Sequence, residues 1–236
     1  MLLRKTLAAA VLMAAVSLLG GCEMLQQEKW EPQESAAISI DEEGIITEII
    51  QEKLDAAYYD ATELQTMIDK EVADYNSQHG ENSITVKTYE AAEGSVKLIM
   101  EYASAEDYAT FNNVEFYYGS MINAQLEGYL FDVSYKKVRD GVVQGSAVSG
   151  SEVIRNMAAT VMVVRAPLEV KVPGEVMYTS TNAEVLGTSV VNATGEQDDE
   201  TDEGLVLPSN AVYKGEEATF EEEAAANRVY IVFEDY

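Results

Sequence analysis

The sequence predicts an α+β fold: an antiparallel sheet with helices on one face, followed by a β-rich C-terminal half. Two patterns support this prediction. In the first half, segments of alternating apolar and polar residues are interrupted by segments with apolar residues at helical spacing, in the order strand–strand–helix–strand–strand–helix. In the second half, short runs rich in β-branched residues are separated by Pro, Gly and Asn, which is typical of strands joined by turns.

The first two strands are predicted at residues 36–41 and 45–54, around a turn at Glu42-Glu43-Gly44. Ile38 and Ile40 alternate with polar neighbours, as they do in a half-buried strand.

A helix is predicted near residues 62–78. Asp60 and Thr62 both suit the N-cap, Thr62-Glu63-Leu64-Gln65 fits a capping box, and Gly80 is expected to end the helix. The apolar stripe that would face the sheet consists of Leu64, Met67, Ile68, Val72 and Tyr75.

The rest of the first half continues with strands and short helices. Strands are expected at 84–88, 96–102, 114–118, 129–139 and 142–144, with turns at Glu93-Gly94 and Asp140-Gly141, and helices at 104–113 and 120–126.

The second half is predicted to be a small β-sandwich or a β-extension of the first. A helical turn is expected at 151–156 and strands at 160–164, 168–172, 176–179, 183–191 and 229–233. Residues 145–150 are small and polar, so we place an α+β domain at 36–145 and a β-rich domain or extension at 146–236. The run 196–204 is acidic and is expected to be a solvated loop.

The N-terminal segment indicates where the protein is located. Arg4 and Lys5 precede an apolar run at 7–19, which is too short for a comfortable transmembrane helix. The run closes on Leu19-Gly20-Gly21-Cys22, which resembles the bacterial lipobox. The alternatives are an ordinary secretory signal with an incidental Cys22, or a buried N-terminal helix.

The resemblance implies that residues 1–21 are a lipoprotein signal peptide and that Cys22 is the lipid-attachment residue. Residues 22–35 would then be a tether, and the chain would be anchored by its Cys22 lipid on the extracytoplasmic face of the cell membrane. The acidic mature chain, the opening Ile38-Ser39-Ile40-Asp41 and the β-rich second half also resemble uncharacterised lipoproteins of anaerobic Gram-positive bacteria. That second resemblance implies no activity.

Charge and cysteine content exclude several functions. The formal net charge of −27 disfavours nucleic-acid binding, which needs Lys and Arg to neutralise phosphates. Cys22 is the only cysteine, so the chain can form no intramolecular disulfide and no cysteine-based metal site.

Most motifs that could carry chemistry have a simpler interpretation. His79, the only histidine, is expected to complement the dipole at a helix C-terminus rather than act in catalysis. Ser134-Tyr135-Lys136-Lys137 matches the Ser-x-x-Lys motif of penicillin-recognising enzymes, but it falls on a predicted strand, where Ser and Lys would point to opposite faces. A hairpin tip is expected to carry the basic residues Lys136, Lys137 and Arg139. These are either solvated charges that protect a strand edge from pairing or a binding site for an anionic wall-polymer phosphate.

No cofactor is predicted. A histidine-rich zinc site is excluded because the chain has one histidine, which leaves calcium at 198–204 as the candidate metal. With Asp199 as the first ligand, Gly204 takes the sixth position of an EF-hand-like loop, but Asn210 replaces the glutamate needed at the twelfth. A solvated charge run is therefore expected there.

Two functions are consistent with these observations. The leading hypothesis is a non-enzymatic binding or cell-envelope interaction module with a glycan or protein partner. Ten of the fourteen tyrosines fall between Tyr58 and Tyr135, and on a strand one member of each adjacent pair can be core while the other is exposed for sugar stacking or a protein interface. Ordinary core and sheet-surface tyrosines are the favoured account. The alternative is a carboxylate-based glycan hydrolase, which would need two facing carboxyls. A transporter-linked solute receptor is disfavoured by the β-rich second half.

Overall fold

The computed structural model describes residues 30–54, 60–92, 94–193 and 228–234. The chain divides after Glu31, and all helices and strands of the described ranges belong to the second unit, Pro32–Tyr236. They are β1 (Ala36–Ile40), β2 (Ile46–Lys53), α1 (Ala61–His79), β3 (Ile84–Ala92), β4 (Ser95–Tyr102), α2 (Ala105–Asn112), β5 (Phe116–Ser120), α3 (Met121–Leu126), β6 (Ser134–Arg139), β7 (Val142–Ser149), α4 (Gly150–Val153), β8 (Thr160–Val164), β9 (Glu169–Lys171), β10 (Glu175–Ser180), β11 (Glu184–Val185), β12 (Val190–Asn192) and β13 (Val229–Glu234).

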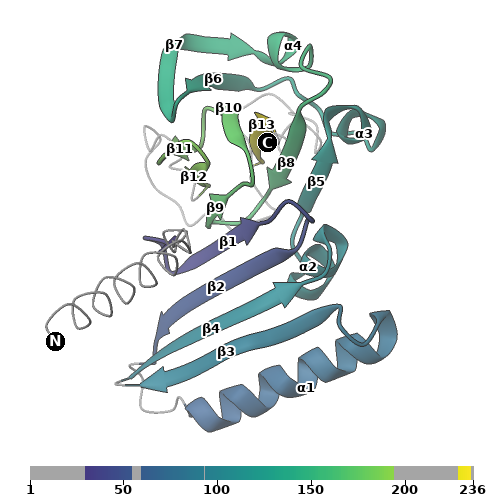
Figure 1. Ribbon diagram of the computed structural model, residues 1–236, viewed down its shortest axis with the longest axis vertical. Helices are drawn as coiled ribbons and strands as arrows, with labels where there is room; N and C mark the ends of the chain where they lie inside the picture. Colours follow the sequence, from purple (N-terminus) through teal and green to yellow (C-terminus); the bar gives the residue numbers. More distant parts are fainter. Residues whose placement is uncertain (1–29, 55–59, 93, 194–227, 235–236) are drawn as a thin grey trace, which may run out of the picture. The chain divides into compact units, whose positions relative to one another are not determined.

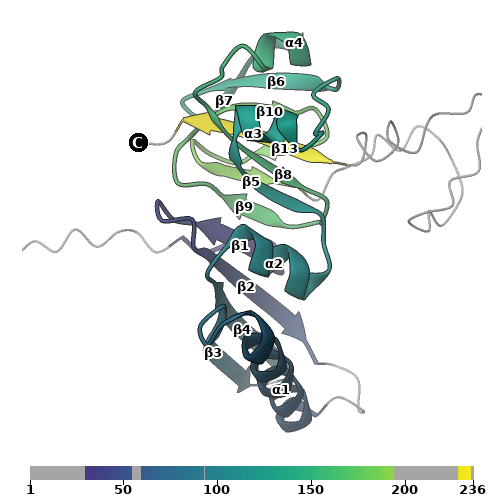
Figure 2. The same ribbon diagram turned by 90° about the vertical axis from the view of Figure 1, so that its right-hand side faces the viewer.

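The strands form two sheets, shown in Figures 1 and 2. Sheet A has seven strands in the order β11-β12-β9-β1-β2-β4-β3, and sheet B has six in the order β5-β8-β13-β10-β6-β7. Among the pairings of the described strands, only β1–β9 is parallel. The α+β class and its antiparallel sheets are therefore confirmed.

Both sheets take strands from both halves of the sequence. The strands β9, β11 and β12 join β1 to β4 in sheet A, whereas β5, β6 and β7 join the later strands in sheet B. Residue 145, the expected domain boundary, lies inside β7. The division of the sequence at 145/146 therefore does not coincide with the division into sheets.

The cap of α1 differs from the predicted capping box. The carboxylate of Asp60 accepts hydrogen bonds from the backbone N–H groups of Thr62 and Glu63 at 2.8 and 3.1 Å, so the N-cap is Asp60 and not Thr62. The glycine expected to end the helix does so, because Gly80 has a φ of +139° and donates to the carbonyl of Asn76. On the predicted stripe Val72 is buried, whereas Met67 is exposed.

Two predicted strands are shorter than expected. The run 129–139 becomes a strand only at Ser134, because its first residues fold over sheet B, where Phe131 lies against Tyr230 with ring centroids 5.2 Å apart. The run 183–191 is interrupted by a turn in which the N–H groups of Leu186 and Gly187 both donate to the carbonyl of Val190.

Two hydrophobic clusters hold the sheets. The larger cluster lies between α1, α2 and sheet A and continues into one face of sheet B, joining Ile38 and Leu98 to Met162 and Phe233. The smaller covers the other face of sheet B and includes Tyr135, Tyr230 and residues of α3 and α4. Sheet B is therefore packed by apolar side chains on both faces except at its edge strand β7, which is largely exposed.

The substitution Gly150→Ala tests how closely α4 packs against the segment that contains Phe131. A Cβ there would overlap the backbone carbonyl of Phe131, which cannot move without shifting the segment that covers sheet B. We expect Gly150→Ala to lower the free energy of unfolding by about 3 kcal/mol in urea titrations. The neighbouring exposed Ser151→Ala should stay within about 0.5 kcal/mol of wild type. Equal stability of the two variants would contradict this account of the packing.

Candidate functional site

One face of sheet A carries α1 and α2, and the other face carries none of the described helices. Cross-strand register places Glu48, Met100 and Val86 on the helix-bearing side, where they join Val72 of α1 and Tyr108 of α2. The alternate residues of β2, β4 and β3 form what we call the open face, namely Thr47, Ile49, Gln51, Thr85, Thr88, Glu90, Ser95, Lys97, Ile99 and Glu101.

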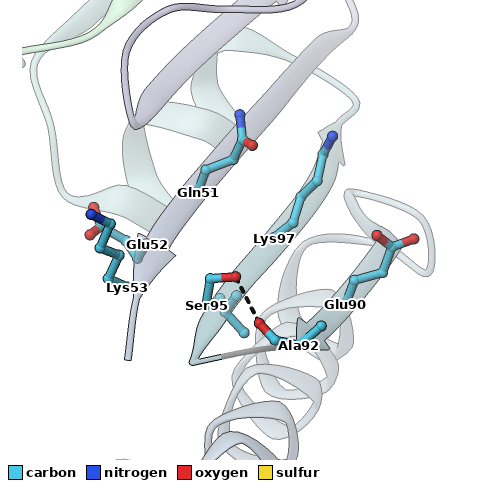
Figure 3. A pocket seen from close by; sticks show the side chains of 8 residues that line it. Gln51, Glu52, Lys53, Glu90, Ala92, Ser95 and Lys97 are labelled. Atoms are coloured by element: carbon cyan, nitrogen blue, oxygen red, sulfur yellow. Dashed lines mark hydrogen bonds between the residues drawn. The ribbon is translucent and has the colours of Figure 1, made fainter. Parts of the chain in front are cut away.

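A shallow pocket of about 300 Å³ lies at the end of the open face. It is lined by Gln51, Glu52, Lys53, Glu90, Ala92, Ser95, Val96 and Lys97. Figure 3 shows Gln51, Lys97 and Glu90 projecting to the same side from three adjacent strands. The register explains this row, because Lys97 of β4 pairs with Gln51 of β2 and with Glu90 of β3.

The pocket suits polar recognition better than acid–base catalysis. Its two carboxylates come from opposite faces of the sheet. Glu90 pairs with Lys97 of β4, whereas Glu52 pairs with Val96, the residue just before Lys97, and adjacent residues of a strand point to opposite faces. They do not form the facing pair that glycoside hydrolysis needs. The ammonium group of Lys97 instead lies between the amide of Gln51 and the carboxylate of Glu90, so the row offers hydrogen-bond donors and acceptors side by side.

Elsewhere on the open face charge is balanced, and none of the residues of β2, β4 and β3 assigned to this face is aromatic. Lys87, at the bulge of β3, forms an ion pair of 2.9 Å with Glu101. Tyr89 and Tyr102 both turn to the helix side, where the hydroxyl of Tyr89 donates to the carbonyl of Ala61. The strand residues assigned to this face therefore provide polar and aliphatic contacts and no aromatic ring.

The basic cluster expected at the β6–β7 hairpin does not converge. Lys136 donates to the carbonyl of Ala183 at 2.6 Å, whereas Lys137 lies 3.7 Å from Glu152 and over the ring of Tyr178. Successive residues of a strand point to opposite faces, so the two ammonium groups are separated by the sheet. The tip itself is as predicted, because Asp140 and Gly141 both have positive φ.

The other predicted candidates have local contacts. His79 ends α1, as expected, and its ring stacks on Tyr75 with centroids 4.0 Å apart. Ser134 and Lys137 lie on β6, so the Ser-x-x-Lys match is on a strand as predicted. Cys22, the acidic run 196–204, Asn210 and the pair Tyr58-Tyr59 lie outside the described residues.

Neither member of the pair Tyr117-Tyr118 is exposed, which agrees with the ordinary structural account of these tyrosines. Tyr117 packs in the smaller cluster and Tyr118 packs against the larger one, because both faces of sheet B are covered. None of the described tyrosines is among the exposed large side chains.

Within the described ranges, no group of three or more His, Cys, Asp or Glu side chains could hold a metal ion. In the same ranges, no helix combines the length and the apolar character that crossing a bilayer requires.

Sequence reasoning missed a buried polar cluster beneath α2. Glu48 of β2 is only 8% exposed, and its carboxylate accepts a hydrogen bond of 2.5 Å from the hydroxyl of Tyr102. Burial raises the pKa of Glu48, and it also raises the pKa of Tyr102 and of Tyr108. The signal was present in the sequence, because Glu48 occupies an inward position of the alternating strand that also holds Ile46.

Paired substitutions on β4 test the assignment of the two faces. We expect Lys97→Ala to leave the free energy of unfolding within about 0.5 kcal/mol of wild type, since its side chain lies on the open face. Leu98→Ala, one residue on, removes a buried core side chain and should cost about 2–5 kcal/mol. Similar losses for both variants in urea titrations would show that the open face is covered.

Comparison with known proteins gives no relative. No protein-family model matches the chain, and no curated protein or solved structure is detectably similar to it.

Proposed function

We propose that the protein is a lipid-anchored lipoprotein of the cell envelope, held on the extracytoplasmic face of the membrane, and that its folded part is a non-enzymatic binding module. The observation that carries the proposal is Leu19-Gly20-Gly21-Cys22 at the end of a charged and then apolar N-terminal segment. The polar open face of sheet A supports the binding role.

Charge explains why a lipid anchor would be needed. A folded part as acidic as this one is repelled by anionic headgroups, so its own surface cannot hold it at a membrane. A diacylglyceryl group on Cys22 supplies two acyl chains, which anchor a protein far more stably than one chain does.

The open face offers the binding surface. Its central Ile49 and Ile99 are surrounded by hydroxyl, amide, ammonium and carboxylate groups, and the pocket with Gln51, Lys97 and Glu90 lies at one end. This mixture suits a glycan or a protein partner bound through hydrogen bonds to a sheet surface.

A carboxylate-based glycan hydrolase is the alternative proposal. It would require a second carboxyl on the same side of the sheet as Glu90, about 5–10 Å away across a bound sugar. Glu52 does not meet this requirement because it lies on the opposite face, and Glu101, which shares the face with Glu90, is ion-paired with Lys87.

Replacing Cys22 tests the anchor. We expect Cys22→Ser in the full chain to abolish incorporation of radiolabelled palmitate and to move the protein from the detergent phase to the aqueous phase in Triton X-114 partitioning. Ser17→Ala, inside the apolar run, is the matched control and should leave both properties unchanged. Unchanged labelling and partitioning of Cys22→Ser would remove the basis of the proposal.

A second experiment tests the binding face. The full chain with Gln51→Ala and Lys97→Ala should retain less envelope glycan and protein than wild type in pull-downs from fractionated envelopes. The control pair Lys70→Ala and Asp74→Ala removes an exposed ion pair of α1 on the other side of the sheet and should retain as much as wild type. Equal retention by all three proteins would show that the open face is not the binding surface.

A further inference from the structure

The polar cluster beneath α2 connects two strands of sheet A with a helix. The hydroxyl of Tyr102 donates to Glu48 and accepts a hydrogen bond of 3.1 Å from the side chain of Asn112, the last residue of α2. Asn112 also donates to the carbonyl of Tyr108, one turn earlier. A continuous chain of hydrogen bonds therefore runs from the carboxyl of Glu48 to the C-terminal turn of α2.

The surroundings of Glu48 are apolar and contain no cation. Its neighbours across the strands are Ile38 and Met100, both buried, and no ion pair between described side chains includes Glu48. A charged carboxylate here is stabilised by the Tyr102 hydroxyl but not by an opposite charge.

The other titratable groups near the cluster remain neutral or face elsewhere. Tyr102 and Tyr108 are the ionisable neighbours, and the raised pKa of each keeps both hydroxyls protonated across the physiological range. Asp107 of α2 points to the other side, where it accepts from Tyr75 of α1 and from Ser104. From sheet B, Phe116 contributes only its ring, 4.8 Å from Tyr108. Glu48 is therefore the group in this cluster that changes charge.

We infer that Glu48 is a proton-operated latch for α2. With the carboxyl neutral, α2 stays seated on sheet A through Tyr102 and Asn112. When the carboxyl loses its proton, the uncompensated charge draws water into the cluster and α2 loosens.

The direction of the pH dependence is set by linkage. Burial is the largest effect on Glu48 and outweighs the opposing hydrogen bond from Tyr102, so its pKa in the closed form is higher than in the open form. The closed form therefore binds the proton more tightly. Its stabilisation is complete below the open-form pKa, about 4.3, and is lost as the pH rises through the raised pKa.

Hydrogen–deuterium exchange of the full chain between about pH 4 and 8 tests the latch. In wild type, the protection of the amides in Ala105–Asn112, corrected for intrinsic exchange and referred to α1, should fall by up to about tenfold per pH unit above the open-form pKa. In Glu48→Gln, which cannot ionise, the protection of α2 should stay constant and should exceed that of wild type at pH 8.

Two further variants make the result specific. Glu101→Gln changes a carboxylate on the open face and should keep the wild-type profile. Tyr102→Phe removes the hydrogen bond that lowers the pKa of Glu48 in the closed form, so the fall in protection should continue to higher pH and its midpoint should move up. The inference would be overturned by a wild-type protection that does not change with pH, or by a Glu48→Gln profile with the same slope as wild type. It would also be overturned if the midpoint in Tyr102→Phe stayed in place or moved to lower pH.

Discussion

The parallel pairing of β1 with β9 joins the two halves of the sequence. Ile38 pairs with Val170 in the interior, and the buried carboxylate of Glu169 accepts hydrogen bonds from the backbone N–H groups of Gln33 and Glu34 at 2.8 and 3.2 Å. Through this contact the segment just before β1 is fixed to a strand more than 130 positions later. The larger hydrophobic cluster can run from sheet A into sheet B because this pairing brings the halves together.

Local signals in the sequence were enough to predict most elements but not the assignment of strands to sheets. Alternation located β3 and β4, Ser104 and Asn113 delimited α2 as expected, and Asp140-Gly141 marked the β6–β7 turn. Pairing partners depend on contacts between residues far apart in sequence, about which a local pattern carries no information. The packing of Phe131 on Tyr230, which makes β6 begin late, is also such a contact.

The candidate site could be predicted even less well, because it consists of common residues. Gln51, Lys97 and Glu90 belong to no motif, and they form a row only through the register of three strands. Glu48 was easier to find in principle, since a carboxylate at an inward strand position conflicts with the apolar pattern around it. The residues that sequence motifs singled out, such as Ser134 and Lys136, have ordinary structural contacts instead.

The position of β13 has a consequence for how the protein reaches its native state. This strand, which is formed by residues 229–234, lies in the interior of sheet B between β8 and β10. Until it is synthesised and inserted, β8 and β10 have no shared neighbour, and one hydrogen-bonding edge of each remains unpaired. Closure of sheet B is therefore a late, non-local step. In the exported lipoprotein that we propose, late closure would keep the chain unfolded until the last of these residues had passed through a secretion channel.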